Sequence, residues 1–172
     1  MPYIDTLQEL LIDELKDLHH AEQQLIIVLP KMASAASNPE LKQEFFEHLE
    51  ETKRHVERLE LAFRKLGAPV QAKSCKAMDG LIEEGTAAVN FRGPDALRDA
   101  CLIGAAQRVE HYEISAYGTA RAFAQMIGEN EVAGLLQDTL EEEGATDRKL
   151  TNVAETVNDD AYNAGRMIDS GR

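Results

Sequence analysis

The chain of 172 residues is within the usual length of one domain and can bury a core without disulfide staples. We expect neither a membrane-spanning nor a secreted protein, because no apolar run approaches the roughly 18 residues of a transmembrane helix and no basic-then-apolar leader is present. Two cysteines favour a reduced, cytoplasmic setting, and 18 basic against 31 acidic residues give a net charge of −13, which disfavours nucleic acid and membranes as partners and attracts cations.

The first half of the chain predicts two long helices. Apolar residues recur at helical spacing through 5–36, where Pro30 is expected to kink the helix or end its regular part. Asn38 followed by Pro39 is typical of a helix N-cap and first helical position, and the second helix then extends until Gly67 stops it. A tight connection makes the two helices an antiparallel hairpin.

The second half repeats this arrangement after a loop and a short helix at about 76–90. A third long helix, rich in small residues, is predicted over 94–127 and ends at Gly128. Asn130 is expected to cap the fourth, which forms the second hairpin with the third. We expect a helical domain over 1–158 and a flexible tail over 159–172.

These elements predict an all-α, four-helix bundle made of two antiparallel hairpins, with the short extra helix in the long connection between helices two and three. A connection of that length can run along the bundle, as in ferritin-like folds. No sustained alternation of apolar and polar residues indicates a strand.

An offset of 91 residues places the first predicted hairpin on the second. Glu22 then coincides with Glu113 and Glu51 with Glu142, so that the two acids of each hairpin are 29 positions apart. A duplicated hairpin with an acid halfway along each helix is one interpretation. The alternative is that any two amphipathic helices of similar length align tolerably.

Acids lie on or beside the apolar stripe of each predicted helix. On the second helix Thr52 is central, with His48 and His55 on one flank. The acids in question are Glu22 on the first helix, Glu51 on the second, Glu110 and Glu113 on the third, and Glu143 and Asp147 on the fourth.

Several carboxylates at one level of a bundle repel one another, and each costs several kcal/mol to bury unpaired. A pair of divalent metal ions removes that conflict, and carboxylates with one or two imidazoles suit iron or manganese. The alternative is that these acids form solvated helix faces, or that Arg54, Arg108 or Arg121 neutralises them.

Five segments, taken together, resemble the YciF/YciE-like family of bacterial stress proteins. They are 21–25 (AEQQL), 48–52 (HLEET), 80–84 (GLIEE), 109–113 (VEHYE) and 140–147 (LEEEGATD). The resemblance extends to about Val157. It implies a ferritin-like, rubrerythrin-like fold, a proposed dimetal site, a homodimer and no established activity.

The ligand pattern of ferritin-like proteins is matched in part. Glu22 supplies the single acid of the first helix, and Glu110-x-x-Glu113 fits the third. The Glu-x-x-His pairs expected on the other two helices are missing, because Arg54 follows Glu51 by three and Thr146 follows Glu143 by three. This departure leaves open the metal's identity and whether ferroxidase chemistry survives.

On the second helix the imidazole is then His55 or His48, and on the fourth the acid is Glu142 or Glu143, with Asp147 as a substitute for the missing histidine. The predicted metal ligands are Glu22, Glu51, His55, Glu110, Glu113, Glu143 and Asp147.

The sequence therefore predicts a stress-response protein with two iron or manganese ions that reacts with peroxide or oxygen. The alternatives are a metal-binding protein without turnover and a structural or partner-binding protein. Other residues are assigned smaller roles. His19, His20 and His111 are expected at the surface or rim, and Tyr112 and Tyr117 in packing, with a hydrogen bond to a ligand as the alternative.

Overall fold

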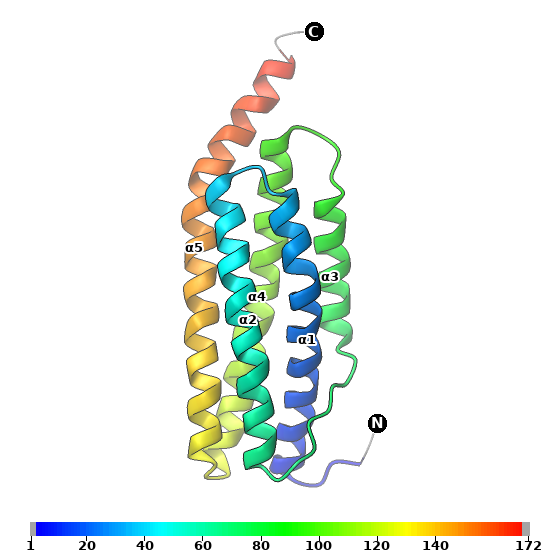
Figure 1. The fold of residues 1–172 in the computed structure, drawn as a ribbon, viewed down its shortest axis with the longest axis vertical. Helices are drawn as coiled ribbons and strands as arrows, with labels where there is room; N and C mark the ends of the chain where they lie inside the picture. The colour runs from blue at the N-terminus through cyan, green and yellow to red at the C-terminus, as the bar shows by residue number, and fades with distance from the viewer. Residues whose placement is uncertain (1–2, 170–172) are drawn as a thin grey trace.

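Five helices make up the part of the chain that the structure, a computed structural model, describes: residues 3–169. They are α1 (Leu7–Ala35), α2 (Pro39–Lys65), α3 (Lys76–Val89), α4 (Asp95–Met126) and α5 (Asn130–Asp169). The four long helices lie side by side, and α3 lies outside them against α1 and α4 (Figure 1). The predicted all-α bundle is confirmed, and residues 3–169 contain no strand. No helix in this range is both long and apolar enough to cross a membrane.

The first hairpin begins and turns where the sequence predicts. Thr6 caps α1 by accepting from the backbone N–H of Glu9, whose carboxylate accepts from the N–H of Thr6. Asn38 caps α2 through the N–H groups of Glu40 and Leu41, with Pro39 in the first turn. Pro30 does not end α1, which continues through it to Ala35.

A buried carboxylate from α4 holds the turn between α1 and α2. Asp99 accepts hydrogen bonds from the backbone N–H groups of Ser37 (2.9 Å) and Asn38 (2.7 Å), and it is 2% exposed. This contact joins the first hairpin to the second at one end of the bundle.

The second hairpin differs from the prediction at its last helix. Gly128, with a φ of 82°, turns the chain after α4, and α5 begins at Asn130 itself. The sequence predicts a tail from position 159, but α5 continues to Asp169, past the ends of the other helices (Figure 1). Ala161 is buried, so this stretch still packs where the prediction has the helix fraying. Residues 170–172 lie outside the described part.

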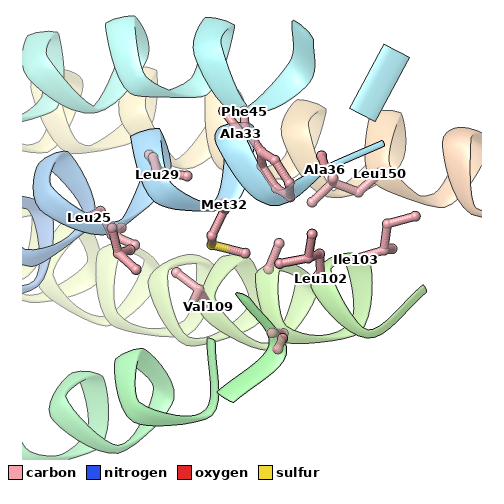
Figure 2. Close-up of a cluster of buried hydrophobic side chains, with 14 of the residues drawn as sticks. Leu25, Leu29, Met32, Ala33, Ala36, Phe45, Leu102, Ile103, Val109 and Leu150 are labelled. Atoms are coloured by element: carbon pink, nitrogen blue, oxygen red, sulfur yellow. The ribbon is translucent and has the colours of Figure 1, made fainter. Parts of the chain in front are cut away.

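Two apolar clusters fill the bundle, one toward each end. The first, partly drawn in Figure 2, includes Leu25, Met32, Phe45, Ile103, Val109 and Leu150. The second includes Leu15, Leu59, Phe63, Tyr117, Val132 and Leu136. Each fully buried side chain of this size contributes about 1.5–3 kcal/mol. The two clusters can therefore offset the cost of the polar layer that lies between them.

Candidate metal centre

Four acids and two histidines from all four long helices meet midway along the bundle. None of them is more than 3% exposed. They are Glu22 on α1, His48 and His55 on α2, Glu110 and Glu113 on α4, and Glu143 on α5.

Helical spacing turns these side chains inward. On α2, His48, Thr52 and His55 follow one another by four and three residues, so they share one face. On α5, Thr139, Glu143 and Thr146 have the same spacing and are all buried. The polar layer is thus the continuation of the apolar stripe of each helix.

The first group of potential ligands is Glu22, His55 and Glu143. Nδ1 of His55 lies 3.4 Å from Oε1 of Glu22 and 3.0 Å from Oε1 of Glu143. The hydroxyl of Tyr117 donates to Oε1 of Glu22. One imidazole therefore faces two carboxylates from different helices.

The second group contains His48, Glu110, Glu113 and, again, Glu143. Nε2 of His48 lies 3.4 Å from Oε1 of Glu110 and 4.0 Å from Oε2 of Glu143. In each group, one potential ligand atom per residue lies within 4.8 Å of all the others. Glu143 belongs to both groups, so its carboxylate could contribute to both.

Many polar atoms of this layer have no hydrogen-bond partner in residues 3–169. They include both oxygens of Glu113 and Glu143, one oxygen each of Glu22 and Glu110, both ring nitrogens of His48 and Nδ1 of His55. A buried polar group without a partner costs about 1–3 kcal/mol, and a charged one costs more. This many unpartnered ligand atoms in one layer fit a bound cation.

Burial and mutual repulsion raise the pKa of several of the acids. Burial raises the pKa of Glu110 and Glu113 well above the ordinary value, and nearby carboxylates, Glu143 foremost for Glu113, add to the rise. Burial likewise raises the pKa of Glu22. Burial works in the same direction on Glu143, but His55 and His48 beside it hold its pKa below the ordinary value.

The imidazoles hold protons that a cation would replace. Burial lowers the pKa of His55, but Glu22 and Glu143 outweigh it and raise that pKa to about 11. The pKa of His48 rises to about 9, because Glu110 and Glu51 outweigh the effect of burial. The metal-free layer is therefore balanced by protons shared among acids and bases.

An outer carboxylate fixes the ring of His55. Nε2–H of His55 donates to Oε2 of Glu142 over 2.8 Å, and Arg58 grips the same carboxylate with Nη1 at 2.6 Å and Nη2 at 2.8 Å. The bonds from Arg58 and His55 lower the pKa of Glu142 to about 2. With Nε2 committed outward, Nδ1 is the nitrogen left for Glu22 and Glu143.

Five of the seven predicted ligands come together, namely Glu22, His55, Glu110, Glu113 and Glu143. Glu51 and Asp147 belong to neither group. Glu51, with a 22% exposed side chain, accepts from Thr146, and Asp147 lies beside Gln107 and His111. Thr52 and Thr146 occupy the inward positions, and their neighbours Glu51 and Asp147 point about 100° away from them.

Three residues have more buried or more polar contacts than the sequence predicts. His48, left as the alternative to His55, joins the layer together with it, and the four-plus-three spacing of the two histidines around Thr52 was the available signal. Tyr117 does more than pack, since it donates to Glu22. His19, expected at the surface or rim, is 4% exposed and lies edge-on to Phe63.

The internal repeat is visible in the contacts of the layer. The offset of 91 that relates Glu22 to Glu113 also relates His55 to Thr146 and Glu51 to Glu142. In the structure His55 donates to Glu142, and Thr146 donates to Glu51. The two halves thus make corresponding contacts across the bundle with different chemical groups.

Comparison with known proteins assigns the chain to a known family. Residues 6–162 match the domain of unknown function DUF892. Protein YciF of Escherichia coli (strain K12) is 44% identical over 160 residues, which cover 92% of this chain and 96% of that protein.

Solved structures agree with this match. The crystal structure of the E. coli stress protein YciF aligns with a TM-score of 0.88 at 42% identity, covering 91% of this chain and 99% of that one. YcfI of Rhodopseudomonas palustris, described as a proposed structural protein, aligns with a TM-score of 0.84 at 40% identity over 87% of this chain and 96% of its own. A Xanthomonas campestris protein, 22% identical over 88% of this chain and 93% of its own, shares the fold with a TM-score of 0.71.

Proposed function

The chain belongs to the DUF892 family and is a relative of the stress protein YciF, and from that premise we propose that its bundle binds two iron or manganese ions and reacts with oxygen or peroxide. Glu22, His55 and Glu143 would hold one ion, and His48, Glu110, Glu113 and Glu143 would hold the other. When bound, the ions supply the electrons that reduce the oxidant.

The observation that carries this proposal is the set of unpartnered carboxylate oxygens. Both oxygens of Glu113 are buried without a hydrogen bond or ion pair within residues 3–169, and the carboxylate of Glu143 is ion-paired only with the imidazoles of His55 (3.0 Å) and His48 (4.0 Å) among these residues. Among the described residues, no arginine forms an ion pair or hydrogen bond with the six groups of the layer. Arg58 bonds Glu142, Arg108 pairs with Glu84 and Arg121 donates to Gln137. Divalent cations remove the repulsion that the four acids create.

The donor set favours iron or manganese over zinc or calcium. Each group offers one imidazole nitrogen among carboxylate oxygens, and neither contains a cysteine. Structural zinc sites are tetrahedral and usually rich in cysteine, whereas calcium takes oxygen ligands alone. Nitrogen and carboxylate donors together suit iron and manganese.

The surrounding residues orient ligands that are themselves shielded from solvent. Glu22, His55, Glu113 and Glu143 are all 0% exposed, so bulk water is excluded from the layer. Tyr117 holds Glu22, while Glu142 and Arg58 orient His55. Such outer contacts fix the direction in which each ligand presents its free electron pair.

Metal binding by matched variants tests the proposal. Protein purified without added metal is titrated with Mn²⁺ or, without oxygen, with Fe²⁺, and two ions per chain are expected for the wild type. Glu143→Gln removes the carboxylate common to both groups, and we expect it to lose both ions. Glu141→Gln, two residues away on the same helix and exposed, is the control and should bind as the wild type does.

Equal binding by Glu143→Gln and Glu141→Gln would contradict the site. The alternative function is then a structural role, which is favoured by the description of YcfI. Consumption of peroxide by protein loaded with iron or manganese separates an enzyme from a metal-binding protein without turnover. We also propose a homodimer, which sedimentation of the full chain would detect.

A further inference from the structure

A small apolar cavity lies beneath α3 and borders the polar layer at Glu110. Its walls come from α1, α3 and α4, and they include Leu25, Met32, Leu81, Gly85, Ala106 and Glu110. Leu25, Met32 and Val109, which also lines it, occupy the space between α1 and α4 (Figure 2). Glu110 therefore belongs both to the cavity wall and to the second ligand group.

The cavity is sized for one very small molecule. Its volume is about 10 Å³, close to the least that holds a single water. On the outer side the wall is α3, where Leu81 and Ile82 are only half-buried. One short helix outside the bundle thus separates solvent from a cavity that Glu110 lines.

Gly85 is the residue of α3 that leaves space in this cavity. It is buried on α3. A Cβ added there would have no heavy atom of another described element within 4 Å. Gly80, on the same helix, also has open space at its Cβ position but is exposed. A larger side chain at position 85 would occupy the cavity, whereas one at position 80 would extend into solvent.

The chemistry of the wall selects an apolar molecule. Glu110 is the only lining residue of this cavity with a polar side chain other than sulfur. Hydrogen peroxide carries two hydroxyl groups, and burying a hydroxyl without a partner costs about 1–3 kcal/mol in proteins. Dioxygen is small and apolar and needs no hydrogen bonds, so this lining favours it over peroxide.

We propose that the cavity beneath α3 is the path by which dioxygen reaches the metal layer, with Gly85 as the residue that leaves room for it. This inference rests on the proposed function and names dioxygen, rather than peroxide, as the oxidant that uses this route.

The first experiment needs no metal. Methyl-labelled, metal-free protein is placed under dioxygen pressure, and paramagnetic relaxation of the methyl groups is measured by NMR. We expect strong enhancement at Met32 and Val109 and little at Leu15 and Leu136, which are also buried but line no part of the cavity. Uniform enhancement across all four, or none at Met32 and Val109, would overturn the proposal.

Variants at the two glycines give the matched comparison. Gly85→Leu should lose the enhancement at Met32 and Val109, and Gly85→Ala, the smaller change, should reduce it. Gly80→Leu adds the same side chain to the exposed side of α3 and should keep the wild-type pattern. Retention of the enhancement in both Gly85 variants would show that dioxygen reaches these methyl groups by another route.

The second experiment uses protein loaded with Fe²⁺. Gly85→Leu should slow oxidation by dioxygen, leave oxidation by hydrogen peroxide unchanged and bind as much iron as the wild type. Equal slowing of both oxidants, or of neither, overturns the assignment of the cavity. A wild type that binds no iron overturns the proposed function instead, and the NMR result on metal-free protein still decides whether dioxygen enters beneath α3.

Discussion

Glu113 shows at the level of one residue how a binding site opposes the stability of its own fold. Its side chain is fully buried on α4, and neither oxygen has a hydrogen bond from the described residues. Burial and the neighbouring acids raise its pKa well above the ordinary value. An acid whose pKa is raised on folding destabilises the folded state at neutral pH, because the unfolded chain can ionise it freely.

Glu113→Met is therefore expected to stabilise the metal-free protein at neutral pH. Methionine has similar volume and needs no partner, so the gain should be about 1–3 kcal/mol. The advantage should shrink as the pH falls toward the pKa of an unfolded glutamate, because protonation then costs the wild type little. Urea unfolding of both proteins at several pH values, with metal removed, measures this. A less stable variant at neutral pH would mean that Glu113 is partnered in solution.

Position on a helix decides how well a single residue can be predicted. Glu22, Glu110, Glu113 and Glu143 are recognisable from sequence because each interrupts or borders an apolar stripe. Glu51 could not be separated from them in this way, since a displacement of one position turns a side chain by about 100° and the threonine at 52 carries no signal of burial. Only the packed bundle shows which neighbour points inward.

The connection between α1 and α2 depends on an element far away in the sequence. Asp99 on α4 accepts from the backbone N–H groups of Ser37 and Asn38, which otherwise have no helical partner. This caps the turn from outside, in addition to the local cap that Asn38 provides for α2.

Asp99→Ala is expected to lower the free energy of unfolding by about 1–3 kcal/mol, because two N–H groups would lose their acceptor. The metal layer is several turns away on α4, so the number of ions bound should not change. Asp159→Ala is the control, since Asp159 is an exposed aspartate on α5. Thermal unfolding and metal titration of the two variants test this, and equal stability of both would refute a capping role.

Helix ends with a local signal were predicted well, and ends set by packing were not. Asn38-Pro39 and the two glycines at 67 and 128, both with positive φ, mark ends that the chain itself specifies. Pro30 removes one hydrogen bond from α1, but both flanking stretches pack in the first apolar cluster, so the helix continues. No capping or helix-breaking residue in the sequence predicts that α5 extends to Asp169.

At the scale of the whole molecule, the polar layer holds exchangeable protons between two apolar clusters. Glu110 and Glu113 have raised pKa values, and those of His48 and His55 reach about 9 and about 11. A metal ion binds the deprotonated form of each ligand, so the ions must displace these protons.

Binding of Mn²⁺ at neutral pH is therefore expected to release protons, and the affinity should rise as the pH is raised toward about 9. The sign follows from the raised values, because both imidazoles and the neutral acids carry protons below them. Calorimetric titration in buffers of different ionisation enthalpy measures the release. Affinity that is independent of pH, with no protons released, would contradict the ligand assignment.

The overall plan of the molecule followed from its sequence more fully than its site did. Two hairpins, the extra helix and the long connection were all predicted from periodicity and chain breaks, which are local properties. Which atoms meet depends on four helix rotations at once, so the pairing of His55 with Glu142 and of Tyr117 with Glu22 required the packed structure.

The division of the six inner groups between the two hairpins has a consequence for how the chain comes together. The half before α3 brings both imidazoles and one carboxylate, and the half after it brings three carboxylates. Each half alone therefore has an excess of one kind of group: the first has more imidazoles than carboxylates, and the second has carboxylates alone. When they meet, the bases of one titrate the acids of the other, and docking of the two halves is a neutralisation as well as an exclusion of water.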